Sequence, residues 1–251
     1  MSVSLHNSSP SPSQTRIEEL SDGTVILSSL PPDFDAGRLR KEMRCHPGST
    51  DEARFEEMLA CAVANGRPKG LYRPCLIEAR QENDVTVQGV TFSGPLLRRQ
   101  LDGVHRVFPF VVTCGRELDA YAPPPGDVLE NYYWGRICTA ILRRAHTNLR
   151  RDLRHRFQVP RTSYISPGSG DPWLWPLEQL PRIFDLLGEI PDRIGVEVKP
   201  TCAMIPKKTL AGFHYASATE FHTCRACHLE ACPDRLAPLD PDFWNELRQD
   251  L

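Results

Sequence analysis

The sequence predicts an α+β fold in which helices pack on a mixed or antiparallel sheet. Runs of β-branched and aromatic residues with alternating polarity, such as Val85–Phe92, are typical of strands. Apolar residues spaced three and four apart, above all in Asp127–Phe157, are typical of helices that cover a core. These two kinds of segment are interleaved along the chain without an internal repeat, which indicates a mixed α+β domain.

Length and composition allow one large globular domain or two small ones, since the chain has 251 residues, 40% hydrophobic and 25% charged. The net charge of -2 gives no global attraction to nucleic acid or to an anionic membrane. No run approaches the roughly 18 apolar residues that a membrane span needs. Its nine cysteines are an odd number and mostly isolated, unlike a secreted disulfide framework. We therefore expect a cytoplasmic protein with no nucleic-acid or membrane partner.

The first third of the chain contains a tail, a strand and two helices. Residues 1–16 are rich in Ser, Pro, Asn and Gln and have little to bury, so we expect a disordered tail. Thr24–Leu30 is predicted to be a strand, and Asp35–Cys45 and Thr50–Asn65 are predicted to be helices. The second helix has Ser49 or Thr50 as its cap and stops before Gly66.

A strand-rich section follows, with strands predicted over Gly70–Ala79, Val85–Phe92 and His105–Cys114 and a hairpin turn at Glu82–Asp84. A helix over Gly115–Tyr121 and a Pro-Pro-Pro-Gly turn lead into the long helix. After Pro160 we expect a loop as far as Pro176. The remaining predicted elements are a helix over Leu177–Gly188 and strands over Ile194–Val198 and Thr209–Ala216.

The long helix has one apolar and one strongly basic face. Its apolar stripe consists of Ile137, Ile141, Leu142, Ala145, Leu149 and Leu153. The basic face carries Arg143, Arg144, Arg150, Arg151, Arg154 and Arg156. Two interpretations stay open for this face: a solvated polar side, which any surface helix needs, or a docking surface that steers an acidic electron-transfer partner.

Three segments carry a resemblance to a known family. These are VTVQGVTFSGPLL with VFPFVVTCGRELDAY, then SPGSGD with WPLEQ, and finally IGVEVKPTCAMIPKKTLAGF. From about Ala36 to Arg235 the chain resembles free-standing relatives of the reactivation (activation) domain of cobalamin-dependent methionine synthase. The resemblance implies that family's α+β fold for residues 17–220. It also implies a role in which the domain binds S-adenosylmethionine beside an oxidised, inactive cobalamin, and methyl transfer after a one-electron reduction restores the cofactor.

The resemblance also suggests which residues hold S-adenosylmethionine. Ser166 and Gly168 match the family's Pro-Gly loop, which lies against that ligand. The family's arginine, three residues before the proline of the loop, is Tyr164 here, and its tyrosine after Pro-Gly is Ser169. Because a phenol cannot replace the charged fork of a guanidinium, Arg161 is our candidate for the missing cation. These five residues are the predicted cofactor-binding set.

The C-terminal segment, residues 221–251, contains a second motif. Cys224, Cys227 and Cys232 have the spacing C-x2-C-x4-C, which can bring three thiolates onto one turn as in some iron–sulfur proteins. A cubane cluster needs a fourth ligand, for which Cys202 is the first candidate and Cys114 the second.

Zinc is the competing metal, because three thiolates with His222 or His228 would complete a tetrahedral site. Unligated reduced thiols are the third interpretation. An iron–sulfur cluster suits a reactivation role better than zinc, since zinc has no redox states and cannot pass an electron to cobalt.

Together these features predict an accessory protein for reductive reactivation of a cobalamin-dependent methyltransferase in methionine biosynthesis. The sequence has no D-x-H-x-x-G cobalamin motif, so we expect the cobalamin to arrive on a corrinoid-bearing methyltransferase. Flavodoxin or ferredoxin are the expected electron donors. The alternative is a non-catalytic interaction module, stapled by zinc or an iron–sulfur cluster, that docks on a corrinoid protein. Whether the chain is itself an enzyme stays open.

Overall fold

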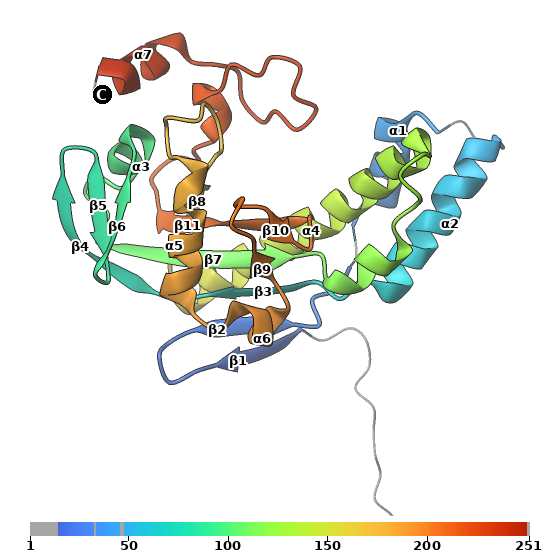
Figure 1. The fold of residues 1–251 in the computed structure, drawn as a ribbon, viewed down its shortest axis with the longest axis horizontal. Coiled ribbons are helices and arrows are strands. Elements are labelled where there is room, and N and C mark those ends of the chain that lie inside the picture. Colours follow the sequence, from blue (N-terminus) through green and yellow to red (C-terminus); the bar gives the residue numbers. More distant parts are fainter. Residues whose placement is uncertain (1–14, 33, 46–47, 250–251) are drawn as a thin grey trace, which may run out of the picture.

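The computed structural model describes residues 15–32, 34–45 and 48–249 (Figure 1). Its main sheet has nine antiparallel strands: β1 (Arg16–Glu19), β2 (Val25–Ser28), β3 (Lys69–Tyr72), β4 (Cys75–Gln81), β5 (Asp84–Val87), β6 (Val90–Ser93), β7 (Arg106–Thr113), β8 (Thr162–Ile165) and β11 (Thr209–Ala216). The strands β9 (Glu197–Val198) and β10 (Met204–Ile205) form a separate hairpin. The predicted α+β class with an antiparallel sheet is therefore confirmed.

Strand β7 is the centre of the main sheet. One of its edges pairs with β3 through Phe110–Thr113 and with β4 through Arg106 and Val107. Its other edge pairs along its length with β11, which in turn pairs with β8. Because side chains of a strand alternate between faces, Val107 and Val111 enter one core and Phe108 and Phe110 the opposite one.

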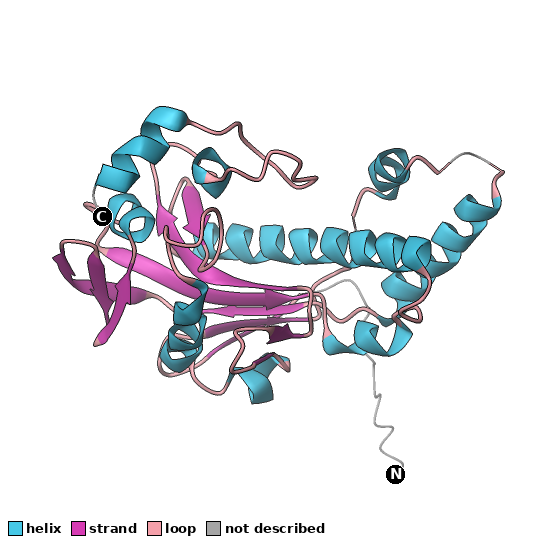
Figure 2. Cartoon of the chain, turned by 45° about the horizontal axis from the view of Figure 1, so that its top comes forward, coloured by secondary structure: helices cyan, strands magenta, loops and turns pink. Residues whose placement is uncertain are grey.

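The helices are α1 (Ala36–Met43), α2 (Thr50–Asn65), α3 (Pro95–Gln100), α4 (Val128–Arg156), α5 (Leu180–Leu187), α6 (Ile190–Ile194) and α7 (Pro241–Gln249), with short 3-10 turns η1 (Arg116–Tyr121), η2 (Leu177–Gln179) and η3 (Thr223–Ala226). Helix α4 covers one face of the sheet, whereas α5 covers the other (Figures 1 and 2). Helices α1 and α2 pack on the N-terminal half of α4 in a third core cluster. None of the helices in the described part of the chain combines the length and apolar character needed to span a membrane.

Helix ends follow local capping chemistry. Ser49 accepts a hydrogen bond from the amide of Glu52 at 3.1 Å and starts α2 where the sequence predicted it. Asp127 accepts one from the amide of Glu130 at 2.9 Å and starts α4. The apolar stripe of α4 is buried as predicted, apart from Leu142, which is partly exposed.

Several sequence-based boundaries were wrong. The strand predicted over Gly70–Ala79 is two strands, because the chain breaks at Arg73 and Pro74. Val85–Phe92 is a hairpin whose turn residues Gln88 and Gly89 both have positive φ. The segment Gly115–Tyr121 is 3-10 rather than α-helical, Ile194–Val198 contains only the two-residue strand β9, and β8 lies where a loop was predicted.

The two ends of the chain also extend the sheet and its core. Of the predicted 1–16 tail, residues 1–14 lie outside the described residues, while Arg16 begins β1. In the C-terminal segment Phe221, Ala226 and Leu247 are buried in the main core cluster. That segment therefore packs on the same core as the preceding domain.

Candidate functional site

The Pro-Gly loop follows β8 and is closed by backbone hydrogen bonds. The Gly168 amide donates to the Trp175 carbonyl at 2.8 Å, and the Ser169 amide donates to the Ser166 carbonyl at 3.2 Å. Gly168 has a φ of +73°, a conformation that favours glycine. The Ser166 hydroxyl is buried and has no hydrogen-bond partner among the described residues. Three of the five predicted cofactor-binding residues, Ser166, Gly168 and Ser169, thus share one tight turn.

Tyr164 lies one strand position before this loop, in an aromatic cluster. Its ring contacts Phe110, His146 and His214, with centroid distances of 6.2, 4.7 and 5.6 Å. Burial raises the pKa of the Tyr164 hydroxyl, which the positive charges of Arg143 and Arg150 on α4 oppose. These two arginines are therefore the cations near Tyr164.

Arg161, the predicted substitute for the missing cation, does not share this position. It is exposed and donates to the Ala218 carbonyl at 2.7 Å. Arg161 lies three positions before Tyr164 and directly precedes β8, so continued strand alternation directs the two side chains to opposite faces. The sequence signal for Arg143 and Arg150 was their spacing on the long helix, where positions 143, 146, 147 and 150 form one stripe.

A histidine pair contacts Tyr164, with His214 buried and His146 half-buried. The Nε2 atoms of His146 on α4 and His214 on β11 are 2.9 Å apart, and Nδ1 of His214 is 3.3 Å from the Ser163 carbonyl oxygen. Burial, with a smaller contribution from the Arg150 charge, lowers the pKa of His146 to about 3. Burial likewise lowers the pKa of His214 well below its usual value. Both imidazoles are therefore neutral at pH 7, and sequence reasoning gave them no role.

The basic face of α4 mostly binds other segments of this chain. Arg143 pairs with Asp234 at 2.7 Å, Arg150 with Glu220 at 2.8 Å and Arg156 with Glu19 at 2.6 Å. Arg150 also donates to the side chain and the carbonyl of Thr162. These ion pairs thus connect α4 to segments near both ends of the described chain.

The three clustered cysteines lie in a loop organised around Arg235. Its guanidinium donates to the carbonyls of Cys224, Cys227, Leu229 and Ala237 at 2.7–3.1 Å. The Leu236 amide donates to Sγ of Cys224 at 3.4 Å. All nine cysteines have free thiols, and Cys202 lies in the turn between β9 and β10 with a φ of +62°.

The described residues do not form a preformed metal site. Within residues 15–249, apart from the short gaps at 33 and 46–47, no group of three or more His, Cys, Asp or Glu side chains is placed so that it could hold a metal ion. Cys202, Cys224, Cys227 and Cys232 as metal ligands stay a prediction from their spacing.

The C-terminal segment packs directly on the Pro-Gly loop. A Cβ atom added to Gly170 would lie 3.0 Å from the Thr223 methyl group. The Asp171 carboxylate accepts hydrogen bonds from Nδ1 of His228 at 3.0 Å and from Nε1 of Trp244 at 2.7 Å. Sequence reasoning missed this contact, since Asp171 and Trp244 are 73 residues apart. One side of the predicted ligand loop is thus covered by the chain itself.

Comparisons with known proteins give a match in structure only. No protein-family model matches the sequence, and no curated protein matches it. Among solved structures, the crystal structure of the MetH reactivation domain bound to AdoHcy is similar, with a TM-score of 0.54 and 15% sequence identity. The match covers 76% of this chain and 69% of that chain. At this identity the likeness establishes the fold, which is that of the MetH reactivation domain.

Proposed function

We propose that this protein is an accessory factor for reductive reactivation of a cobalamin-dependent methyltransferase. The observation that carries the proposal is the shared fold with an AdoHcy-bound MetH reactivation domain, in a chain that keeps a closed Pro-Gly turn at Ser166–Ser169. The nucleoside of S-adenosylmethionine would lie against this turn and the Tyr164 ring. We place the protein in the cytoplasm, with the corrinoid on a partner methyltransferase.

The residues of this chain would bind and orient the methyl donor. The Gly168 backbone allows close approach of a ligand, and the half-buried Tyr164 ring, which packs edge-on against Phe110 and His146, would contact the purine ring. The partner's cobalt would take one electron from a flavodoxin or ferredoxin and then the methyl group from the sulfonium, leaving S-adenosylhomocysteine. The cysteine run could carry an iron–sulfur cluster or zinc, but no step of this proposal passes through a metal. Metal analysis and electron paramagnetic spectra of anaerobically purified protein test that prediction.

Calorimetric titration with S-adenosylmethionine and S-adenosylhomocysteine tests ligand binding. We expect saturable heat at ligand concentrations below the millimolar range. Tyr164→Ala should weaken binding about tenfold, because it removes an aromatic wall of the site. Tyr121→Ala is the matched control, since that tyrosine is exposed beside α2 and bonds Asn65. Absence of heat up to millimolar ligand would contradict the nucleoside site.

One observation favours a second candidate function, a non-catalytic module that docks on a corrinoid protein. The C-terminal segment occupies the flank of the Pro-Gly loop through Gly170 and Asp171, where a ligand-binding loop would need space. The same titration separates the two functions. Binding of the corrinoid partner without any binding of the nucleoside would favour the module.

A further inference from the structure

Asp234, two residues after the last clustered cysteine, reaches across to α4. Its Oδ1 atom lies 2.7 Å from Nη1 of Arg136 and 2.7 Å from Nη2 of Arg143. Arginine guanidinium groups bind the carboxylate or phosphate groups of ligands in the same way that these two groups bind one carboxylate oxygen here. The cysteine-bearing segment thus places the Asp234 carboxylate between Arg136 and Arg143, which together are called the arginine clamp below.

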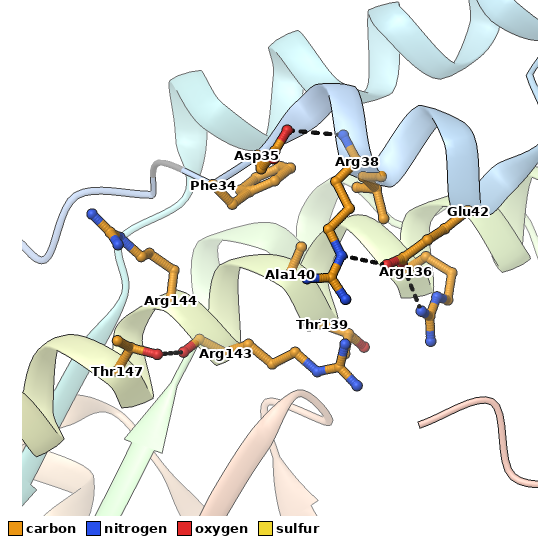
Figure 3. Close-up of a pocket in the computed structure, with 11 residues that line it drawn as sticks. Phe34, Asp35, Arg38, Glu42, Arg136, Thr139, Ala140, Arg143, Arg144 and Thr147 are labelled. Atoms are coloured by element: carbon orange, nitrogen blue, oxygen red, sulfur yellow. Dashed lines mark hydrogen bonds and ion pairs between the residues drawn. The ribbon is translucent and has the colours of Figure 1, made fainter. Parts of the chain in front are cut away.

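The cavity around this clamp carries an excess of positive charge. It has a volume of about 340 Å³ and is lined by four arginines, among them Arg38 and Arg235, but by only two carboxylates, Glu42 and Asp234. A second cavity of about 270 Å³, between α1 and α4, shares Arg38, Glu42 and both clamp arginines (Figure 3). Figure 3 shows Arg38 and Arg136 both reaching Glu42. If Asp234 swung out, the clamp would be left with a larger positive surplus.

Arg136 needs an anion beside it. Its side chain is only 13% exposed, and its Nε is buried without a hydrogen-bond partner among the described residues. Arg136 pairs with Asp234 at 2.7 Å and with Glu42 at 3.3 Å, and Glu42 also pairs with Arg38. Loss of Asp234 would leave two guanidinium groups on one carboxylate, whereas exchange of Asp234 for another oxyanion preserves the pairing. Because Oδ1 of Asp234 contacts both guanidinium groups, Asp234 competes with any ligand anion for them.

The clamp adjoins the candidate site. Arg143 lies one helical turn before His146 on α4, and the His146 ring contacts Tyr164 with a centroid distance of 4.7 Å. Asp234 of the cysteine-bearing segment pairs with Arg143, which connects that segment to α4 close to the aromatic cluster. We propose that Arg136 and Arg143 form a binding site for the carboxylate or phosphate group of a small molecule, which Asp234 occupies in the unliganded protein. Ligand binding then releases the segment Cys224–Leu236 from α4.

The test uses inorganic phosphate and succinate as probes with the full chain. Asp234→Asn removes the internal anion with little change in shape, and we expect it to bind one or both probes at least about tenfold more tightly than the wild type in calorimetry. Adding Arg143→Gln should abolish this gain. A response to phosphate alone identifies a phosphate ligand, and a response to succinate alone identifies a carboxylate ligand. Asp185→Asn, at an exposed carboxylate on α5, is the matched control and should bind like the wild type.

Thiol labelling gives a second readout. Saturating probe should raise the labelling rates of Cys224, Cys227 and Cys232 in the wild type, whereas the rate of Cys61 on α2 stays constant. Equal affinities in Asp234→Asn and the wild type would overturn the proposal, as would a gain that survives Arg143→Gln. Because neither probe contains a nucleoside, failure here leaves the test with S-adenosylhomocysteine unaffected.

Discussion

At the scale of single residues, the cluster around Tyr164 consists of aromatic and imidazole rings packed against one another. The His146–His214 pair, stacked on Phe110, has imidazoles that burial keeps unprotonated. Tyr164 stands where the sequence resemblance predicts an arginine, and the charges of Arg143 and Arg150 on α4 act on its hydroxyl.

The histidine pair should make stability fall on acidification. Below pH about 6.5 the unfolded chain protonates these imidazoles, whereas the folded chain keeps them neutral down to about pH 3 at His146. Since the unfolded state binds more protons in this window, stability rises with pH there and is lost as pH falls. Each histidine contributes up to about 1.4 kcal/mol per pH unit to that slope.

We therefore expect His146→Gln to flatten the dependence of unfolding free energy on pH, by up to about 1.4 kcal/mol per pH unit between about pH 4 and 6. Urea unfolding at several pH values measures it. The control is His155→Gln, because His155 is exposed near the end of α4 and should leave the slope as it is. Identical slopes in wild type and His146→Gln would show that the pair is not kept neutral by burial.

At the scale of elements, a glycine is required at position 168 of the Pro-Gly loop, whereas a glycine at position 135 of helix α4 is unfavourable. Gly168→Ala places an alanine at a backbone φ of +73°, and its Cβ would lie 3.0 Å from the Leu177 side chain. We expect a loss of about 1–2 kcal/mol in unfolding free energy and weaker binding of S-adenosylhomocysteine. Gly135→Ala in α4 meets nothing within 4 Å and should gain about 0.5–1 kcal/mol. Thermal unfolding and calorimetry check both, and a harmless Gly168→Ala would contradict the tight turn.

Elements with strong local signals could be predicted from the sequence, while those made by distant pairing could not. Helix α2 was located to the residue, because Ser49 caps it and Gly66 with Pro68 ends it. Strand β8 was missed because its four residues follow Pro160 and gain their conformation from pairing with β11, some fifty residues away. The hairpin in Val85–Phe92 was missed although the apolar alternation changes phase between Val87 and Val90, where Gln88 and Gly89 form the turn.

In the candidate site, too, local features could be predicted from the sequence and contacts between distant segments could not. The loop residues Ser166, Gly168 and Ser169 are neighbours in sequence, so one motif was enough to group them. The partners of Asp171 and of Arg143 come from the C-terminal segment, and nothing local indicates that His228 or Asp234 would reach them. Arg161 was the candidate for the missing cation, but it is exposed and donates to the Ala218 carbonyl instead.

At the scale of the whole molecule, the C-terminal segment is an integral part of the fold. It enters the main core through Leu247 and holds the ligand loop through Asp171 and the long helix through Asp234. The MetH reactivation fold thus forms here together with a covering segment that contacts the predicted nucleoside loop and an arginine clamp.

Spectroscopy of a corrinoid partner tests whether this protein takes part in reactivation. A cobalamin-dependent methyltransferase in the inactive cob(II)alamin form is mixed with a one-electron donor and S-adenosylmethionine, with and without this protein. We predict that substoichiometric protein accelerates the return of the methylcobalamin spectrum, and that Gly168→Ala slows that return. An unchanged rate with a partner to which the protein demonstrably binds would contradict the account and leave only a docking role.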